Sequence, residues 1–332
     1  MRYVITGGSG YIGSRLVELL VARDDTERVL ITDIRAPSMT RPKADFVRMD
    51  IRDRGMRKLL ESESPDALVH LAFVLNPMHD EHTMYDIDVN GSQNVLDAAS
   101  RADVKQVLVA SSTTAYGAWP DNPPLLVEDD PVRGMPNYEY ARDKTEIDRM
   151  CQLWAAQHPD RTMTIVRPCI VFGPSVDNYI VRFWEYAPFI PLVDGTDMEL
   201  QYVHEDDVVD ALSRLLVESR AGIFNLAGDG TLRLSEAARI AGLKTRRVPF
   251  RIYRRLAAAL WRLRVPRAEA PPGQIDFLRF PWLASNEKIK RELDWTPRFT
   301  SRETFEIAIR AKRDQTKTGG PASAVERLPV GA

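Results

Sequence analysis

Residues 1–13 read "MRYVITGGSGYIG", a short β-branched run that passes directly into closely spaced glycines. Gly7, Gly10 and Gly13 permit a tight turn, close approach of the backbone to a phosphate group, and close packing of a helix on a strand. A helix beginning at this turn would offer free N–H groups and the positive end of its dipole to that phosphate. A glycine triplet alone is a weak signal, because any tight strand–helix turn favours glycine. The stretch therefore predicts a strand, a turn and a helix, and its meaning depends on the rest of the chain.

The first half of the chain alternates strands with helices. Its β-branched runs predict strands at residues 2–6, 28–33, 45–49, 67–72, 106–111 and 163–168. Helical periodicity fills most of the intervals, as in "YIGSRLVELLVAR". This alternation predicts an α/β fold, a doubly wound parallel sheet of the Rossmann type, with ligands bound beyond the carboxyl ends of the strands.

The second half is less regular and richer in aromatic residues and proline, which predicts a smaller C-terminal substrate domain. We expect each of the two domains to be built from two segments: 1–169 with about 201–228, and about 170–200 with 229–313. The stretch "QYVHEDDVVDALSRLLVES" predicts a strand and a helix with Asp206 or Asp207 as the N-cap. Residues 314–332 lack periodicity and are expected to be a disordered tail.

Composition narrows the class of protein. The 332 residues are 44% hydrophobic and 28% charged, as in ordinary globular domains, and the net charge of −2 gives no general attraction to nucleic acid. The two cysteines, Cys151 and Cys169, are too few for a disulfide framework and suit a reducing compartment. The N-terminus lacks a signal-peptide pattern, and no apolar run approaches the ~18 residues of a spanning helix. We expect a soluble, cytoplasmic protein.

An acidic residue in the first half indicates which nucleotide would bind. Asp33 closes the second predicted strand 20 residues after Gly13, where a carboxylate would accept hydrogen bonds from an adenosine ribose. A carboxylate there would repel a 2′-phosphate, so NAD is favoured over NADP. Arg15 and Arg35 could pair with a 2′-phosphate, although solvated helix and loop charges are the simpler interpretation.

Tyr140 and Lys144 stand four residues apart in a predicted helix and therefore share one face. Lowering a phenol pKa of about 10 by ~2–3 units requires roughly 3–4 kcal/mol. One ammonium ~4 Å away at a partly screened site supplies about that much, so the pair is sufficient for acid–base catalysis. The same spacing also occurs by chance in helices. The hydroxyls that end the strand "VLVASSTTAYG", Ser112 among them, favour the catalytic interpretation, because they fall where a parallel sheet presents its ligand contacts.

Together these residues resemble the extended short-chain dehydrogenase/reductase family, in particular its NAD-dependent epimerase/dehydratase branch (UDP-glucose 4-epimerase-like), up to about residue 313. Further matching stretches are "MDIRD" (49–53), "HLAFV" (70–74), "RPCIVFGP" (167–174), "QYVHEDDVV" (201–209) and "FNLAG" (224–228). The resemblance implies that Ser112 is the catalytic hydroxyl, that Tyr140 is the acid–base, and that Lys144 lowers the Tyr140 pKa and holds the nicotinamide ribose. The cofactor-binding residues that it implies are Gly7, Gly10, Tyr11, Ile12, Gly13, Asp33, Asp50, Ile51, Leu71, Ala72, Tyr140 and Lys144. It also implies a homodimer formed through a helix bundle.

The chain departs from the family at several positions. Thr113–Thr114 replace the acidic residues of the dehydratases, which argues against dehydration. Ile170 replaces an asparagine of the UDP-galactose 4-epimerases, and arginines expected near Leu200 and Pro271 are missing. Asp88 stands where the family usually has asparagine. These departures leave the residues for hydride transfer intact. A UDP-sugar substrate is therefore expected only because it is the usual substrate in the family.

Three hypotheses follow. The first is an NAD-dependent epimerase of a sugar, nucleotide-linked by resemblance, that acts by transient oxidation. The second is an NAD(P)-dependent dehydrogenase or reductase of a less polar alcohol or ketone. The third, a catalytically silent nucleotide-binding protein, is disfavoured by the intact set of Ser112, Tyr140 and Lys144.

Two further features have simpler interpretations. Residues 250–267 could form an amphipathic helix, with five arginines between 251 and 264, that touches an anionic membrane or a lipid-like substrate. We expect instead a helix packed on the core with its arginines in solvent, and no membrane contact. His70 and His204 are expected to be packing residues. His79 and His82 lack further ligands, so no metal site is predicted.

Overall fold

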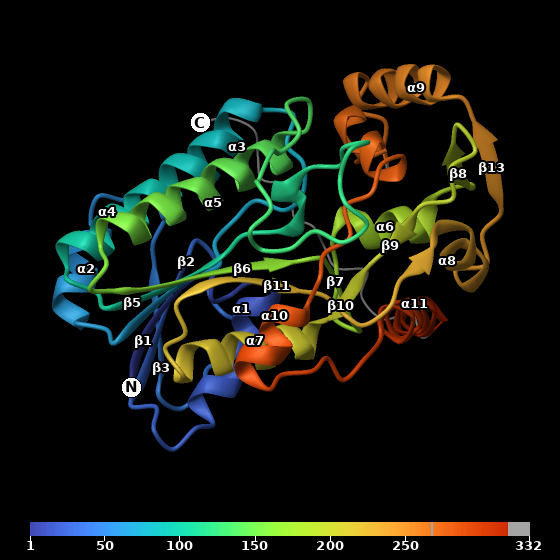
Figure 1. The fold of residues 1–332 in the computed structure, drawn as a ribbon. Coiled ribbons are helices and arrows are strands. Elements are labelled where there is room, and N and C mark those ends of the chain that lie inside the picture. Colours follow the sequence, from blue (N-terminus) through green and yellow to red (C-terminus); the bar gives the residue numbers. More distant parts are fainter. Residues whose placement is uncertain (267, 318–332) are drawn as a thin grey trace.

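The computed structural model describes residues 1–266 and 268–317. Its central sheet has seven parallel strands in the order β11-β6-β5-β4-β1-β2-β3 (Figure 1). The strands are β1 (Arg2–Thr6), β2 (Arg28–Asp33), β3 (Ala44–Arg48), β4 (Ala67–His70), β5 (Gln106–Ala110), β6 (Thr162–Pro168) and β11 (Gly222–Leu226). The chain winds outward from β1 to β3 and then crosses back to β4, which confirms the predicted doubly wound fold.

Helices cover both faces of this sheet. One face is covered by α2 (Met56–Glu63), α4 (Gly91–Arg101) and α5 (Glu139–Gln157), and the other by α1 (Tyr11–Val21), α7 (Glu205–Val217) and α10 (Glu287–Leu293) (Figure 1). Strand β1 shows why its sequence is apolar throughout: Tyr3 and Ile5 pack toward α1 and α7, whereas Val4 packs toward α4. A parallel strand buried on both faces needs apolar residues at successive positions.

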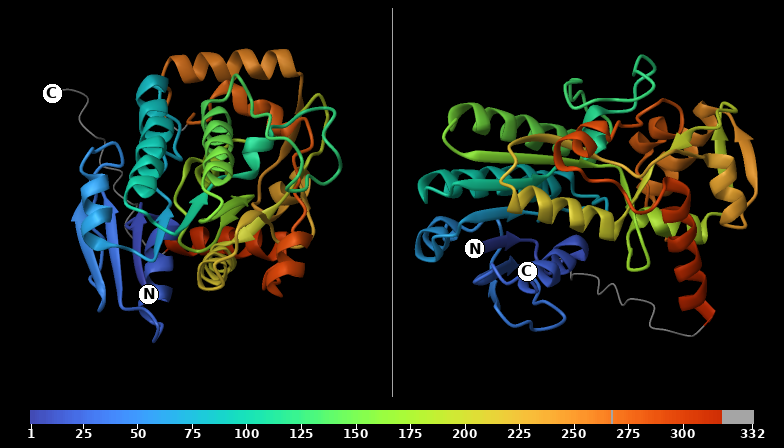
Figure 2. Two further views of the ribbon diagram at one scale, coloured as in Figure 1. Left: turned by 60° about the vertical axis from the view of Figure 1, so that its left-hand side comes forward. Right: turned by 60° about the horizontal axis from the view of Figure 1, so that its bottom comes forward.

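The remaining elements form a smaller region at the carboxyl ends of the strands (Figures 1 and 2). Its paired strands are β7 (Ile170–Phe172) with β10 (Tyr202–His204), β9 (Glu199–Leu200) with β12 (Leu232–Arg233), and β8 (Ile190–Val193) with β13 (Thr245–Val248). Its helices are α6 (Tyr179–Tyr186), α8 (Leu234–Ile240), α9 (Phe250–Arg262), the 3₁₀ helix η3 (Pro272–Leu278) and α11 (Ser301–Lys317). The Trp184 and Phe305 rings meet edge to face at 4.9 Å in its core. The domain boundaries given above remain a prediction.

Two local predictions were wrong. The N-cap of α7 is His204, whose Nδ1 accepts a hydrogen bond from the Asp206 backbone N–H at 3.2 Å. The acidic residues instead occupy the first turn, where they complement the helix dipole. Residues 314–317 continue helix α11, in which the Arg313 side chain donates to the Ile240 carbonyl, and the rest of the predicted tail lies outside the described residues.

Short elements position the loops above the sheet. The β4 strand leads through a loop into α3 (Glu81–Tyr85) and the π-helical turn η1 (Asp86–Asn90), and β5 leads into the 3₁₀ turn η2 (Thr113–Tyr116). None of the helices in the described ranges is long and apolar enough to cross a bilayer.

Candidate active site

The glycine turn after β1 has room for backbone only. Gly7 has a φ of +72°, and a Cβ there would lie 2.6 Å from the Ala72 nitrogen. A Cβ on Gly13 would lie 2.3 Å from the Gly7 carbonyl oxygen. Helix α1 begins at Tyr11 without a side-chain cap on its first N–H groups. The turn therefore fits a pyrophosphate, since these N–H groups and the dipole end stand beside an uncrowded backbone.

Asp33 fixes the conformation of this turn. Its Oδ2 accepts a hydrogen bond from the Ser9 backbone N–H at 3.2 Å, and its Oδ1 accepts one from the Arg35 backbone N–H at 3.1 Å. Arg15 is paired with Asp206 at 2.6 Å and with Glu205, so its guanidinium is already neutralised by carboxylates of α7. The arrangement disfavours Arg15 as a partner of a 2′-phosphate.

Glu205 anchors the start of α1 and was not singled out from the sequence. This fully buried carboxylate also accepts a hydrogen bond from the Tyr11 hydroxyl. Burial is the main cause that raises the Tyr11 pKa, followed by the charge of Glu205. The acidic run "HEDD" (204–207) was the sequence signal for a buried carboxylate at this place. It could not identify the partner, because Arg15 lies 190 positions before Glu205.

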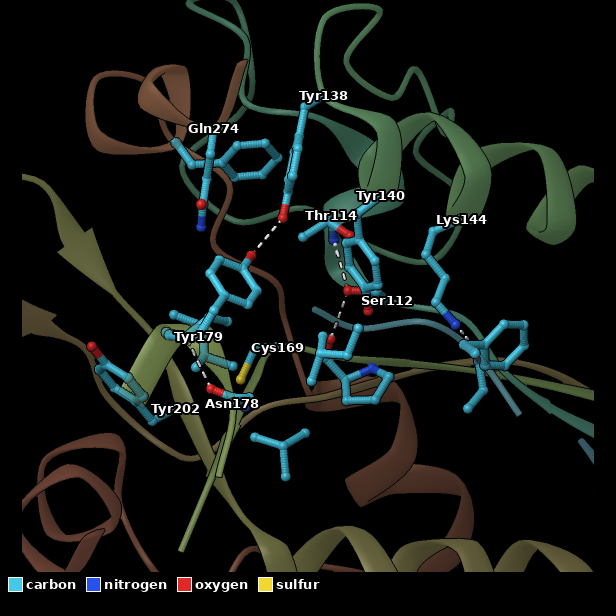
Figure 3. A pocket seen from close by; sticks show the side chains of 18 of the residues that line it. Ser112, Thr114, Tyr138, Tyr140, Lys144, Cys169, Asn178, Tyr179, Tyr202 and Gln274 are labelled. Carbon is cyan, nitrogen blue, oxygen red and sulfur yellow. Dashed lines mark hydrogen bonds between the residues drawn. The ribbon is translucent and has the colours of Figure 1, made fainter. Parts of the chain in front are cut away.

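Ser112 lies just beyond the carboxyl end of β5. Its Oγ accepts a hydrogen bond from the Thr114 backbone N–H at 3.2 Å and donates to the Pro168 carbonyl at 3.5 Å (Figure 3). A hydrogen bond between Ser112 and Tyr140 favours the phenolate form of Tyr140. This bond opposes the larger effect of burial, which raises the Tyr140 pKa. The Thr113 and Thr114 hydroxyl oxygens are buried and have no hydrogen-bond partner within the described residues. The strand end thus presents hydroxyls as predicted.

Tyr140 and Lys144 come from the first turns of α5 and line the same cavity (Figure 3). Lys144 Nζ donates to the Ala110 carbonyl at 2.7 Å and lies 3.1 Å from the centre of the Phe73 ring. Its distance from the centre of the Tyr140 ring is 5.9 Å.

The electrostatics of this pair differ from the expected ones. Burial raises the pKa of Tyr140, and the charges of Tyr179 and Asp88 add to that effect, while the hydrogen bond with Ser112 opposes it. Burial also lowers the pKa of Lys144, against the opposing charge of Asp88. In this arrangement the Lys144 ammonium donates to the Ala110 carbonyl, and its distance of 5.9 Å from the ring centre leaves the burial of the partly exposed Tyr140 as the larger influence, so the role of Lys144 in lowering the Tyr140 pKa remains a prediction.

Asp88, the departure from the family's asparagine, is buried in η1. Its Oδ1 accepts a hydrogen bond from the Val74 backbone N–H at 2.8 Å. Burial raises the Asp88 pKa, and Lys144 opposes the shift. The carboxylate therefore holds the loop after β4 and supports the charged form of Lys144.

The histidines are placed as follows. Both ring nitrogens of His70 are hydrogen-bonded, to the hydroxyls of Thr6 at 2.6 Å and Ser92 at 2.9 Å. Burial lowers the His70 pKa to about 3, so the ring is neutral. His204 caps α7, and both residues are packing residues as predicted. His79 stacks on Trp261 at 3.9 Å. The described part of the chain contains no group of three or more potential metal ligands.

The cavity has a volume of about 400 Å³ and extends from the glycine turn into the smaller region. Tyr138 and Tyr179 share a hydrogen bond of 2.6 Å between their hydroxyls on its substrate side (Figure 3). Sequence reasoning missed this pair, because the two tyrosines come from separate elements. Lys144 is the one charged side chain among the described residues that line the cavity.

Three apolar residues that we aligned with polar family positions, Ile170, Leu200 and Pro271, all line this cavity. A diphosphate bound there would lack the cations that offset its charge. Other apolar lining residues are Ile180, Phe183, Trp184, Leu234, Tyr253, Ala257, Ile275, Phe277, Leu278 and Trp282. The substrate side is therefore much less polar than the family default predicts.

The structure gathers most of the predicted site residues around one cavity. Those that line it are Gly7, Gly10, Tyr11, Ile12, Gly13, Leu71, Ser112, Tyr140 and Lys144. Asp33, Asp50, Ile51 and Ala72 are not among its lining residues, and Asp50 is paired with Arg52 at 2.7 Å. Their roles in cofactor binding remain predictions.

Known proteins resemble the chain in sequence, and solved structures resemble it in fold. The chain is 29% identical over 318 residues to the uncharacterized protein Rv0501 of Mycobacterium tuberculosis, covering 93% of this chain and 83% of that protein. It is 27% identical to the UDP-glucose 4-epimerase of Streptococcus mutans, covering 90% of this chain and 92% of that enzyme. The UDP-glucose 4-epimerase of Thermus thermophilus, solved in complex with NAD, superposes with a TM-score of 0.72 at 23% identity, covering 94% of this chain and 99% of that one.

The sequence pattern of one family covers most of the chain. The model of the NAD dependent epimerase/dehydratase family matches residues 3–227, from the first strand through the last strand of the sheet. This span contains the glycine turn, the strand-end hydroxyls and the tyrosine–lysine helix. The chain belongs to the NAD dependent epimerase/dehydratase family.

Proposed function

We propose that the protein is an NAD-dependent epimerase of a sugar that acts by transient oxidation of a hydroxyl group. The observation that carries the proposal is that Ser112, Tyr140 and Lys144 line one cavity together with the glycine turn. Likeness to UDP-glucose 4-epimerases over most of the chain supports a sugar substrate.

The chain's own residues have distinct roles in this proposal. The glycine turn and the start of α1 hold the pyrophosphate of NAD, and Asp33 holds its adenosine ribose. NAD, when bound, supplies a hydride acceptor that can return the hydride. Ser112 orients the reacting oxygen, and Tyr140 accepts or donates its proton. Lys144 stabilises the phenolate when its ammonium is directed toward Tyr140.

A second candidate function is the net oxidation or reduction of a less polar alcohol or ketone. The apolar residues at positions 170, 200 and 271 favour it, because they cannot offset the charge of a nucleotide diphosphate. The raised Tyr140 pKa favours proton donation to a carbonyl, which is the reductive direction.

The nucleotide content of freshly purified protein separates the two candidates. An epimerase regenerates its cofactor in each cycle and can retain it, whereas a dehydrogenase must exchange it. Near-stoichiometric NAD released on denaturation is the expected result for epimerisation. An empty protein that binds NAD(H) weakly and reversibly would contradict it and support the second function.

Substitution of the acid–base tests both candidates. Tyr140→Phe should lower turnover by about 10²–10⁴-fold while cofactor binding is retained. Tyr85→Phe is the matched control, because the Tyr85 hydroxyl bonds Glu146 at the surface, at 2.6 Å, and does not line the cavity. Full activity of Tyr140→Phe would refute the assignment.

A further inference from the structure

Helix α9 has an outer face that is exposed from its first turn to its last. None of its 13 residues is buried, contrary to the expected core-packed helix. Ile252, Leu256, Ala259 and Leu263 follow the spacing of one helix face and are all exposed, Ile252 by 61% and Leu263 by 74%. In a monomeric soluble protein such an apolar face ordinarily packs against the core.

The polar face of α9 is strongly basic. Residues 250–266 contain five arginines, at positions 251, 254, 255, 262 and 264, and no acidic residue, although the whole chain carries a charge of −2. All five arginines are exposed, and none forms a salt bridge to a carboxylate of the described residues. Elsewhere, for example at Arg52 and Arg182, guanidinium groups are paired.

The inner face of α9 forms part of the cavity wall. Tyr253 and Ala257 line the same cavity as Tyr140. Trp261 stacks on His79, which belongs to the loop that also carries Phe73 to the cavity. Figure 1 shows α9 at the outer edge of the molecule, and the helix packs against η3. One helix therefore separates an apolar cavity from an exposed apolar and cationic surface.

We propose that α9 docks the protein on an anionic phospholipid bilayer, and that the substrate is an alcohol or ketone with a hydrocarbon portion that enters the cavity beside this helix. The apolar strip would enter the boundary between headgroups and acyl chains, and the arginines would pair with lipid phosphates. The substrate part of this inference rests on the second candidate function, the oxidation or reduction of a less polar alcohol or ketone, whereas the docking part rests on neither candidate.

Two other partners fit the surface less well. In a two-fold contact between copies of this chain, the same arginines would face one another across the interface. A nucleic acid would use the arginines and leave the apolar strip of Ile252, Leu256 and Leu263 in water. An anionic bilayer would contact both the apolar strip and the arginines.

Vesicle co-sedimentation tests the docking without substrate. We would compare pure phosphatidylcholine vesicles with vesicles that contain phosphatidylglycerol. The wild-type protein should sediment only with the anionic vesicles, and its binding should weaken as salt is raised. Arg251→Gln combined with Arg255→Gln should weaken partitioning by about fivefold per arginine. Ile252→Ser combined with Leu256→Ser should weaken it at every salt concentration.

The matched control combines Arg101→Gln with Leu153→Ser, because both side chains are exposed on helices of the sheet domain, α4 and α5, and neither belongs to α9. This control should bind vesicles as the wild type does. Equal binding of the α9 variants and the control, or no binding to anionic vesicles at low salt, would overturn the proposal. A change in oligomeric state of the Ile252/Leu256 variant, measured by light scattering, would also overturn it in favour of a contact between copies.

Substrate binding is measured separately from docking. A long-chain secondary alcohol, titrated in detergent, should change the fluorescence of the cavity residues Trp184 and Trp282, whereas a UDP-sugar should not. The reverse result would overturn the substrate class. Tyr140→Phe should bind vesicles normally, so retained turnover in this variant would refute the proposed function and leave docking intact.

Discussion

A buried ion pair behind the strand-end hydroxyls allows a quantitative test of the structure. Arg167 and Asp148 are exposed by only 1% and 0%, and two parallel hydrogen bonds of 2.7 and 2.8 Å join them. Asp148 also accepts a hydrogen bond from the Ser111 hydroxyl at 2.6 Å, next to Ser112. The pair thus links α5, β6 and the segment that presents the catalytic hydroxyl.

Asp148→Asn keeps the shape of this side chain but removes its charge. The guanidinium of Arg167 would stay buried without a counter-ion, since its other contacts are to the Tyr116 hydroxyl and the Glu128 carbonyl. Breaking a buried pair in this way costs about 3–5 kcal/mol, a large part of the ~5–15 kcal/mol that stabilises a typical domain.

The assay is urea unfolding, followed by circular dichroism, with the free energy of unfolding compared at an unchanged m-value. Glu61→Gln is the control, because the Arg57–Glu61 pair is exposed by 52% and 39% and should contribute only about 0.3–0.5 kcal/mol. Asp148→Leu combined with Arg167→Met should be less destabilising than Asp148→Asn, because no unpaired charge remains. A loss below about 1 kcal/mol for Asp148→Asn would refute the reasoning.

Three other outcomes follow from the site. Gly13→Ala should abolish NAD binding, measured by calorimetry, since its Cβ would lie 2.3 Å from the Gly7 oxygen. Gly230→Ala is strained by its φ of +72° but should still bind NAD, because Gly230 does not line the cavity. The rate of alcohol oxidation should rise with pH from about 6 to 10, because burial raises the Tyr140 pKa and oxidation needs the phenolate; a plateau from about pH 7 would contradict this. Burial lowers the His70 pKa to about 3, so between that pH and the ordinary histidine pKa of about 6.5 the unfolded state binds more protons than the folded state. The free energy of unfolding should therefore fall as pH drops below about 6.5, by up to ~1.4 kcal/mol per pH unit. His70→Gln should flatten this slope.

The sheet was predictable because its determinants are local. Each strand is a short β-branched run, and β1 carries apolar residues toward both helical layers. The glycines at 7 and 13 are required by contacts within the first strand–helix unit and with the adjacent loop. Such signals are readable within a few dozen residues.

The electrostatics of the site were not predictable, because they arise between distant segments. Lys144 is directed by a carbonyl of β5 and by Phe73, and neither follows from its helix. Arg167 is likewise bonded to the Tyr116 hydroxyl, 51 positions away, and Glu205 to Arg15, 190 positions away. The spacing of Tyr140 and Lys144 predicted that they share a helix face, but not the balance between desolvation and charge at the phenol.

The cavity and α9 together indicate where a bound substrate can carry charge. Ile170, Leu200 and Pro271 line the interior, and none of them can offset an anion, whereas the arginines of α9 lie outside the same wall. Burying an uncompensated anion costs far more free energy than burying a hydrocarbon of similar size gains. A substrate with both a carbinol and an anionic group would therefore place the carbinol at Tyr140 and its apolar portion along the wall, and would keep the anionic group in solvent outside the cavity.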